Sequence, residues 1–161
     1  MAKRILVIAV MIFAALEASA GDFVDEMCKS YKKVEGAQVI SLGKTMLSMA
    51  FAKADKETKA TLKKINKMTI VALDADKPGL GDRVKADLST AEQKGAQLIG
   101  EMTDDKTKTY FKAYIVKEGE LYTHLLMYFK SDDGTKSGLI DMSGRFLESD
   151  LETLGKSAKP I

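Results

Sequence analysis

The chain has 161 residues, of which 45% are hydrophobic and 30% are charged, and its formal net charge is +2. This composition is typical of a folded globular domain and excludes an intrinsically disordered chain. The near balance of positive and negative charge gives no overall attraction to nucleic acid, so we expect no nucleic-acid partner.

The first twenty residues have the pattern of a secretory signal peptide. Lys3 and Arg4 precede an apolar run over Ile5–Leu16, and the small residues Ala18 and Ala20 stand at the two positions that signal peptidase reads. A membrane-spanning helix needs roughly 20 apolar residues, more than this run supplies. The sequence therefore predicts a cleavable leader over residues 1–20, with an uncleaved N-terminal anchor as the alternative.

Cleavage between Ala20 and Gly21 leaves residues 21–161 as one domain, long enough to bury a core and without a stable membrane span. The expected location is exported, either periplasmic or secreted. Cys28 is the only cysteine and stands too far beyond the apolar run to carry a lipid anchor. It also has no partner for an intramolecular disulfide, so packing must stabilise the domain.

Helical and extended segments alternate in the first half of the domain. The expected elements are a helix from Asp22 to about Val34, a strand over 38–42, a helical apolar segment over 46–51, a lysine-rich amphipathic stretch over 55–67, a buried strand over 68–73, a loop over 74–81, and a helix from Asp82 to Gly95.

The apolar period changes from about 3.6 to 2 after Gly95. Four strands are predicted, over 96–102, 108–116, 121–129 and 136–142. Short turns between them indicate an antiparallel meander. Ser149 begins a final helix with a capping box to Glu152, and Gly155 ends it. The predicted fold is a single α+β domain, a mainly antiparallel sheet with helices packed on one face.

A hairpin centred on Glu118 and Gly119 gives a first assignment of the sheet faces. If Val116 pairs with Leu121, then Tyr114 lies opposite Thr123, and Phe111, Ala113 and Ile115 occupy the other side. The second set is less charged, so we assign it to the helix-covered core. The remaining side is the candidate contact face, made of Tyr110, Lys112, Tyr114 and Thr123.

No catalytic or metal-binding set is recognisable in the sequence. Cys28 adjoins an apolar stripe and is interpreted as a packing residue, with an intermolecular disulfide or a nucleophile as alternatives. His124, the single histidine, is interpreted as bonded or packed within the sheet, because a zinc site would need carboxylates or Cys28 for its other ligands.

Two short motifs fail at decisive positions. Gly43-Lys44-Thr45 ends like a phosphate-binding loop, but Gln38 stands where that loop needs its first glycine. Asp74–Gly79 opens like a calcium loop, but Pro78 and Lys85 stand where coordinating oxygens are required. We therefore predict no cofactor.

The lysine-rich stretch over Lys56–Lys67 has two interpretations. It is either a solvated helix face or a surface for anionic lipid or polysaccharide. Asp55 and Glu57 dilute its charge, and only Leu62 and Ile65 are strongly apolar. The narrow apolar side favours the solvated face.

Two segments resemble the domain of unknown function 4252 family, small exported proteins of Gram-negative bacteria. They are Tyr31–Ser41 (YKKVEGAQVIS) and Gly138–Phe146 (GLIDMSGRF), the second followed by Asp150-Leu151. Many members resemble lipoproteins, and this chain differs from them because it lacks a lipobox. The resemblance implies no activity, cofactor or catalytic residue.

These observations favour a non-catalytic envelope domain that binds an envelope protein or ligand whose identity is unknown. The first alternative is a small periplasmic enzyme, such as a hydrolase acting on envelope material. The second is a structural or adhesive subunit that recruits copies through an exposed sheet edge.

Overall fold

The computed structural model describes residues 20–74 and 76–157, with side chains described as far as Thr153. The expected leader, residues 1–19, lies outside the described residues, while Ala20 and Gly21 form the start of the first described helix. Within the described part of the chain, no helix is long and apolar enough to cross a membrane.

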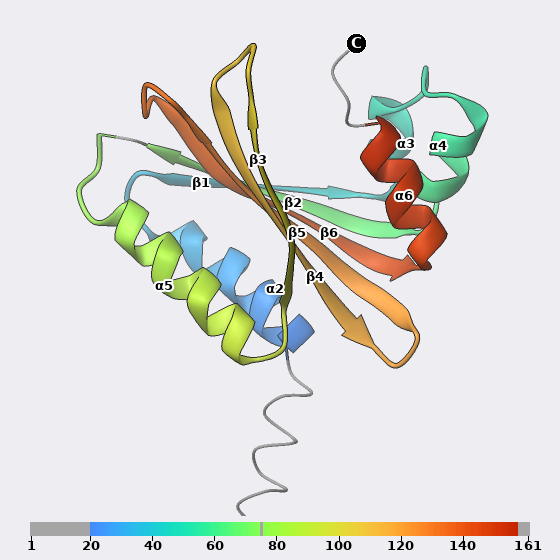
Figure 1. Ribbon diagram of the computed structural model, residues 1–161, viewed down its shortest axis with the longest axis horizontal. Helices are drawn as coiled ribbons and strands as arrows, with labels where there is room; N and C mark the ends of the chain where they lie inside the picture. Colours follow the sequence, from blue (N-terminus) through green and yellow to red (C-terminus); the bar gives the residue numbers. More distant parts are fainter. Residues whose placement is uncertain (1–19, 75, 158–161) are drawn as a thin grey trace, which may run out of the picture.

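Six antiparallel strands form one sheet in the order β1-β2-β6-β5-β4-β3. The strands are β1 Ala37–Gly43, β2 Ile65–Asp74, β3 Gln97–Asp104, β4 Thr109–Glu118, β5 Leu121–Ser131 and β6 Lys136–Phe146. All six predicted strands are present, and β3 to β6 form the predicted meander (Figure 1). The α+β fold class is therefore confirmed.

Two helices cover one face of the sheet. They are α2 (Ala20–Ser30), which continues into the 3-10 turn η1 (Tyr31–Lys33), and α5 (Leu80–Gln93). Figure 1 shows them side by side below the sheet. Their buried side chains pack against strand residues of the same face in the larger core: Val24, Met27, Tyr31, Val84, Leu88, Val71, Tyr114, Leu126 and Leu139.

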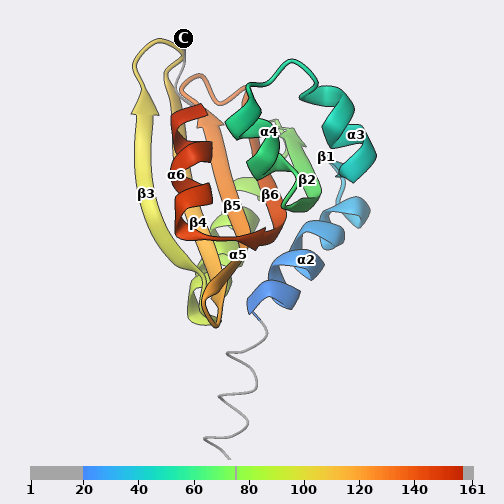
Figure 2. The ribbon, with the colours of Figure 1, turned by 90° about the vertical axis from the view of Figure 1, so that its right-hand side faces the viewer.

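Three more helices lie on the opposite face, at one end of the sheet (Figures 1 and 2). They are α3 (Lys44–Ala50), α4 (Lys56–Leu62) and α6 (Glu148–Ser157). The second core lies beneath them and includes Leu47, Leu62, Ile65, Ile115, Leu125, Met142, Phe146 and Leu151. Helices thus cover both faces, which corrects the expectation that they all share one.

Three helix termini differ from the expected positions. Asp22 lies inside α2, and Gly79, with a φ of 87°, precedes α5 in place of Asp82. The last helix begins at Glu148 and continues through Gly155. Its start is capped by the Asp150 carboxylate, which accepts a hydrogen bond from the Leu147 N–H at 2.7 Å, so the box predicted at Ser149 is wrong.

Candidate functional site

The register of β4 and β5 differs from the expected pairing, and the assignment of the sheet faces is wrong as well. Gly119 and Glu120 form a two-residue turn, so Glu118, and not Val116, pairs with Leu121. A bulge at Val116/Lys117 then places Val116 opposite His124. Tyr114 is only 1% exposed, because α2 and α5 cover its face of the sheet. The expectation that it belongs to an open contact face is wrong.

Three of the four residues of the predicted contact face nevertheless line one hollow. Tyr110, Lys112 and Tyr114 lie with Tyr128 and Glu92 around a space of about 370 Å³ beside α5. Burial, followed by the nearby Glu92 charge, raises the pKa of Tyr114 to about 12, so its hydroxyl stays protonated. The rings of Tyr110, Tyr114 and Tyr128 belong to the larger core or pack against it.

Lys112 and Thr123 complete the predicted set. Lys112 lies 3.7 Å from the carboxylate of Glu101 on β3, a neighbouring cross-strand pair. Thr123 lies at the irregular start of β5 and directs its hydroxyl towards the Val116 carbonyl at 3.5 Å. It does not line the hollow, so the four residues form no common surface.

His124 is a buried, hydrogen-bonded sheet residue, as predicted. Its Nδ1 lies 3.1 Å from Oδ1 of Asp141 on β6, and Asp141 is itself 1% exposed. Burial opposes protonation of the imidazole, but the hydrogen bond to Asp141 and the charges of Asp141, Asp25 and Glu118 outweigh it and raise the pKa of His124. The sequence analysis did not single out Asp141. The feature that could have identified it is a carboxylate that interrupts the otherwise apolar segment Leu139–Met142 of a buried strand.

Cys28 is a packing residue, as predicted. It is 2% exposed within the larger core. Burial first, and then the charges of Asp141 and Asp25, raise the pKa of its thiol to about 12. A thiol of this kind is protonated at neutral pH and does not provide a nucleophile.

A different surface, on α3 and the turn after it, exposes large apolar side chains. Met46, Met49 and Phe51 are 56%, 74% and 37% exposed, and only Leu47 of α3 is buried. Soluble domains rarely leave neighbouring large apolar side chains uncovered without an interaction to make. The apolar residues of the segment 46–51 therefore lie on two sides of it. Leu47 packs into the second core, whereas Met46, Met49 and Phe51 face solvent.

The segment that carries these apolar side chains is rich in lysine. Residues 44–67 contain seven lysines and two acidic residues, a net charge of +5, whereas the whole chain carries +2. Five of these lysines are exposed and take part in no salt bridge among the described residues: Lys44, Lys53, Lys56, Lys59 and Lys63. The near-neutral total of the whole chain therefore conceals a strongly positive segment.

A hollow of about 310 Å³ lies between α3 and α4. Its apolar lining includes Leu47, Phe51 and Leu62, and Lys59 and Lys63 line it as well. Lys59 lies on α4 and Lys63 is its C-cap, one helical turn later, and both line the hollow. We name Met46, Met49, Phe51, Lys59 and Lys63 the α3–α4 surface.

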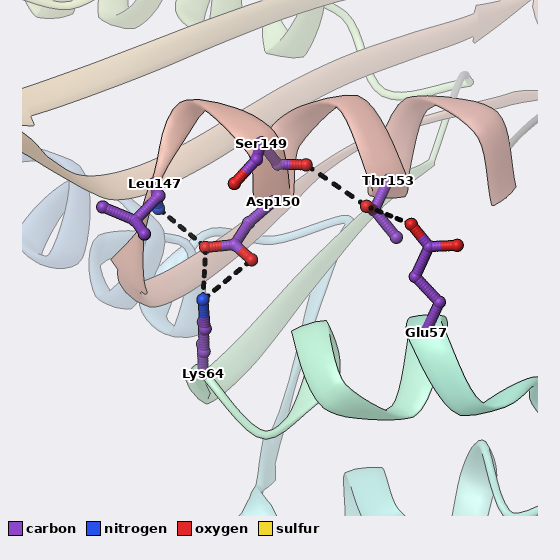
Figure 3. Close-up of polar contacts among 6 residues, drawn as sticks. All are labelled: Glu57, Lys64, Leu147, Ser149, Asp150 and Thr153. Atoms are coloured by element: carbon purple, nitrogen blue, oxygen red, sulfur yellow. Dashed lines mark hydrogen bonds and ion pairs between the residues drawn. The ribbon is translucent and has the colours of Figure 1, made fainter.

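Polar contacts join α4 and the turn after it to α6 (Figure 3). Lys64, in the turn between α4 and β2, donates hydrogen bonds to both carboxylate oxygens of Asp150 at 2.9 and 2.8 Å. The Thr153 hydroxyl lies 3.2 Å from the Glu57 carboxylate of α4. These contacts hold α4 in a defined position beside the second core.

Comparison with known proteins gives a family and no activity. No curated protein and no solved structure matches the chain significantly. The match to the family described as Domain of unknown function (DUF4252) covers residues 31–154, from η1 to α6, and so includes the whole sheet. The chain belongs to this DUF4252 family.

Proposed function

We propose that this protein is an exported, non-catalytic domain that binds the anionic lipid surface of the cell envelope through its α3–α4 surface. The observation that carries the proposal is the exposure of Met46, Met49 and Phe51 in a segment whose five exposed lysines form no salt bridge with any described residue. Interfacial protein segments combine these two features, an apolar side that enters the headgroup region and a basic rim that meets lipid phosphates.

The charge of the surface contributes to reversible attachment. A lysine near an anionic membrane contributes about 1 kcal/mol, and the attraction is lost beyond about 10 Å at 0.1 M salt. Lys59 and Lys63 therefore contribute about 2 kcal/mol together when both reach the headgroups. The exposed methionines add an apolar contribution that salt does not screen.

The hollow between α3 and α4 favours a lipid over a purely polar anion. Leu47, Phe51 and Leu62 give it apolar walls, and Lys59 and Lys63 provide the positive charge. A polysaccharide would use the lysines and leave these walls unsatisfied. An anionic lipid matches both, since its phosphate suits the ammonium groups and part of its acyl chain suits the walls.

Vesicle co-sedimentation tests this function. We expect the purified protein to sediment with vesicles of phosphatidylglycerol and phosphatidylcholine, and to bind phosphatidylcholine alone far more weakly. The double variant K59Q/K63Q should bind the anionic vesicles about 10–30-fold more weakly, as a loss of about 2 kcal/mol implies. The variant M46S/M49S should also bind weakly, and salt should abolish its remaining binding, because only the charge contribution is left.

The control is the variant K85Q/K106Q, which removes the same charge from exposed positions outside the α3–α4 surface. It should bind like the unmodified protein. Equal losses in K85Q/K106Q and K59Q/K63Q would mean that net charge alone drives binding. Equal binding to neutral and anionic vesicles would contradict the proposal.

Export is the second part of the proposal and is supported by the leader pattern in residues 1–20. Mass spectrometry of the protein from fractionated cells should find a chain beginning at Gly21 in the periplasm or the medium. A chain that keeps its first residues and stays with the cytoplasm would contradict export. The vesicle experiment does not depend on this result.

A further inference from the structure

A second group of polar residues lies on the face of the sheet opposite the α3–α4 surface, beneath the start of α2. Its centre is the His124 side chain, which is 6% exposed. Asp141 holds Nδ1 of the imidazole, with its two oxygens at 3.1 and 3.2 Å. The other ring nitrogen, Nε2, points to Asp25 on α2 at 3.9 Å and makes no hydrogen bond with any described residue.

Two carboxylates approach Nε2 from different elements. Asp25 lies one turn after Gly21 on α2 and its side chain is 35% exposed, while Glu118 ends β4. A Cβ placed on Gly21 would lie 3.1 Å from Nε2 and 3.2 Å from Oε1 of Glu118. The missing side chain of Gly21 therefore leaves space beside both groups.

We propose that Nε2 of His124 and the carboxylates of Asp25 and Glu118 bind a divalent transition metal ion, with zinc as the best match. Imidazole with carboxylates suits zinc better than calcium or magnesium, which prefer oxygen ligands alone. Asp141 is the outer carboxylate that fixes the ring and leaves Nε2 free for the metal, a pairing found at most histidine-ligated metals.

The observed distance between His124 and Asp25 suits this assignment. Two ligands that each lie about 2.0 Å from a tetrahedral zinc are about 3.3 Å apart. Nε2 and Oδ2 of Asp25 are separated by 3.9 Å, which a rotation of the Asp25 side chain closes. Asp25, His124 and Asp141 each offer a ligand atom, all within 4.8 Å of one another. The exposed side of Asp25 gives the ion a path from solvent.

The expected absence of a metal site rested on the single histidine. One imidazole suffices when carboxylates supply the remaining ligands. Cys28 is not part of the set, since its side chain is 2% exposed and packs within the larger core. Asp25, Glu118 and Asp141 come from three different elements, so their convergence depends on the register of the sheet and the position of α2.

Zinc chloride titration tests the proposal. The chelator-treated protein should bind one equivalent of zinc in competition with a chromophoric indicator, and its melting temperature should rise with zinc concentration. D25N and E118Q should each weaken binding at least 10-fold. G21A should do the same, because its methyl group fills the space beside Nε2 and Glu118.

Asp22 and Glu120 provide matched controls. Both are exposed, and they lie on α2 and in the β4–β5 turn, close in sequence to the proposed ligands. D22N and E120Q should bind zinc like the unmodified protein, and C28S should keep full affinity. Because D25N and E118Q alter groups at the edge of the core, their folding is checked by circular dichroism before titration.

Three results would overturn the site. They are no zinc binding at micromolar concentration, unchanged affinity in both D25N and E118Q, and loss of binding in C28S. X-ray absorption of the zinc-loaded protein should show nitrogen and oxygen ligands only, and a sulfur ligand would also exclude the assignment.

Discussion

The ammonium group of Lys64 lies 2.9 and 2.8 Å from the two carboxylate oxygens of Asp150, which is 86 positions away in sequence. The same carboxylate accepts the N–H of Leu147 at 2.7 Å. One side chain thus caps α6 and joins it to the turn between α4 and β2 (Figure 3). Asp150 is 7% exposed, so water does not replace these partners easily.

Replacing Asp150 by Ala should lower the free energy of unfolding by about 2 kcal/mol. The substitution removes a helix cap and leaves the Leu147 N–H and Lys64 without their shared acceptor. Lys64 is 41% exposed and can be hydrated, which keeps the cost below that of a fully buried ion pair. Urea denaturation measures it. The control K63M, at the neighbouring exposed position, should change stability much less than K64M.

Acid should remove part of this stability. Burial opposes ionisation of Asp150, but the hydrogen bonds from Lys64 and the Leu147 N–H outweigh it and hold its pKa below the usual 3.8. The contribution is therefore complete above about pH 4 and is lost as the pH falls through the lowered pKa. The stability difference between the unmodified protein and D150N should shrink below pH 4. A constant difference down to pH 2 would contradict this reasoning.

Gly144 should not tolerate a side chain. It pairs with Ile65 where β2 and β6 are irregular, and a Cβ there would overlap the Lys64 carbonyl oxygen. The neighbouring atom belongs to the backbone and cannot rotate away, so G144A should cost roughly 2–4 kcal/mol, near the upper end of overpacking effects. Gly100 in β3 is the matched control, since a Cβ there meets nothing within 4 Å. Similar melting temperatures for G144A and G100A would show that β2 and β6 adjust freely.

Tyr31 should contribute through its hydroxyl as well as its ring. The ring is fully buried, its hydroxyl donates to Asp87 on α5 at 2.6 Å, and Arg83 lies over the ring at 5.0 Å. Y31F should therefore cost about 1–2 kcal/mol, because a hydrogen bond to a charged acceptor is lost while Asp87 regains some water. Y122F is the control, as the Tyr122 hydroxyl makes no hydrogen bond with a described residue. If Y31F is as stable as Y122F, the Tyr31 hydroxyl does not stabilise the fold, and only its ring does.

The strands could be predicted from the sequence because their alternation and turns are local signals. The faces could not, because both sides of the central strands are apolar: Tyr114 and Val116 face one core, and Ile115 faces the other. In such a strand, the alternation of side chains correctly predicts which residues share a face. It does not predict which of the two faces α2 and α5 cover. The bulge at Val116/Lys117 then shifts the pairing that the turn sets.

The candidate sites depend on these non-local relationships. The lysine-rich segment was visible in the sequence, but the exposure of Met46 and Met49 was not, because apolar spacing alone does not show which side of a short helix is covered. His124 was visible as the single histidine. Its neighbours Asp141 and Asp25 are placed by the pairing of β5 with β6 and by the packing of α2.

Cys28 provides the last prediction, because its thiol reports the opening of the larger core. With a pKa of about 12, the buried thiol should react with Ellman's reagent at pH 8 at least about 10³-fold more slowly than in the unfolded chain, where an ordinary thiol has a pKa near 8.5. Denaturant should restore the fast reaction. The control is C28S/S89C, whose thiol stands at an exposed position of α5 and should react quickly in the folded protein. A folded protein in which Cys28 reacts as fast as that control would mean that α2 opens readily from the sheet.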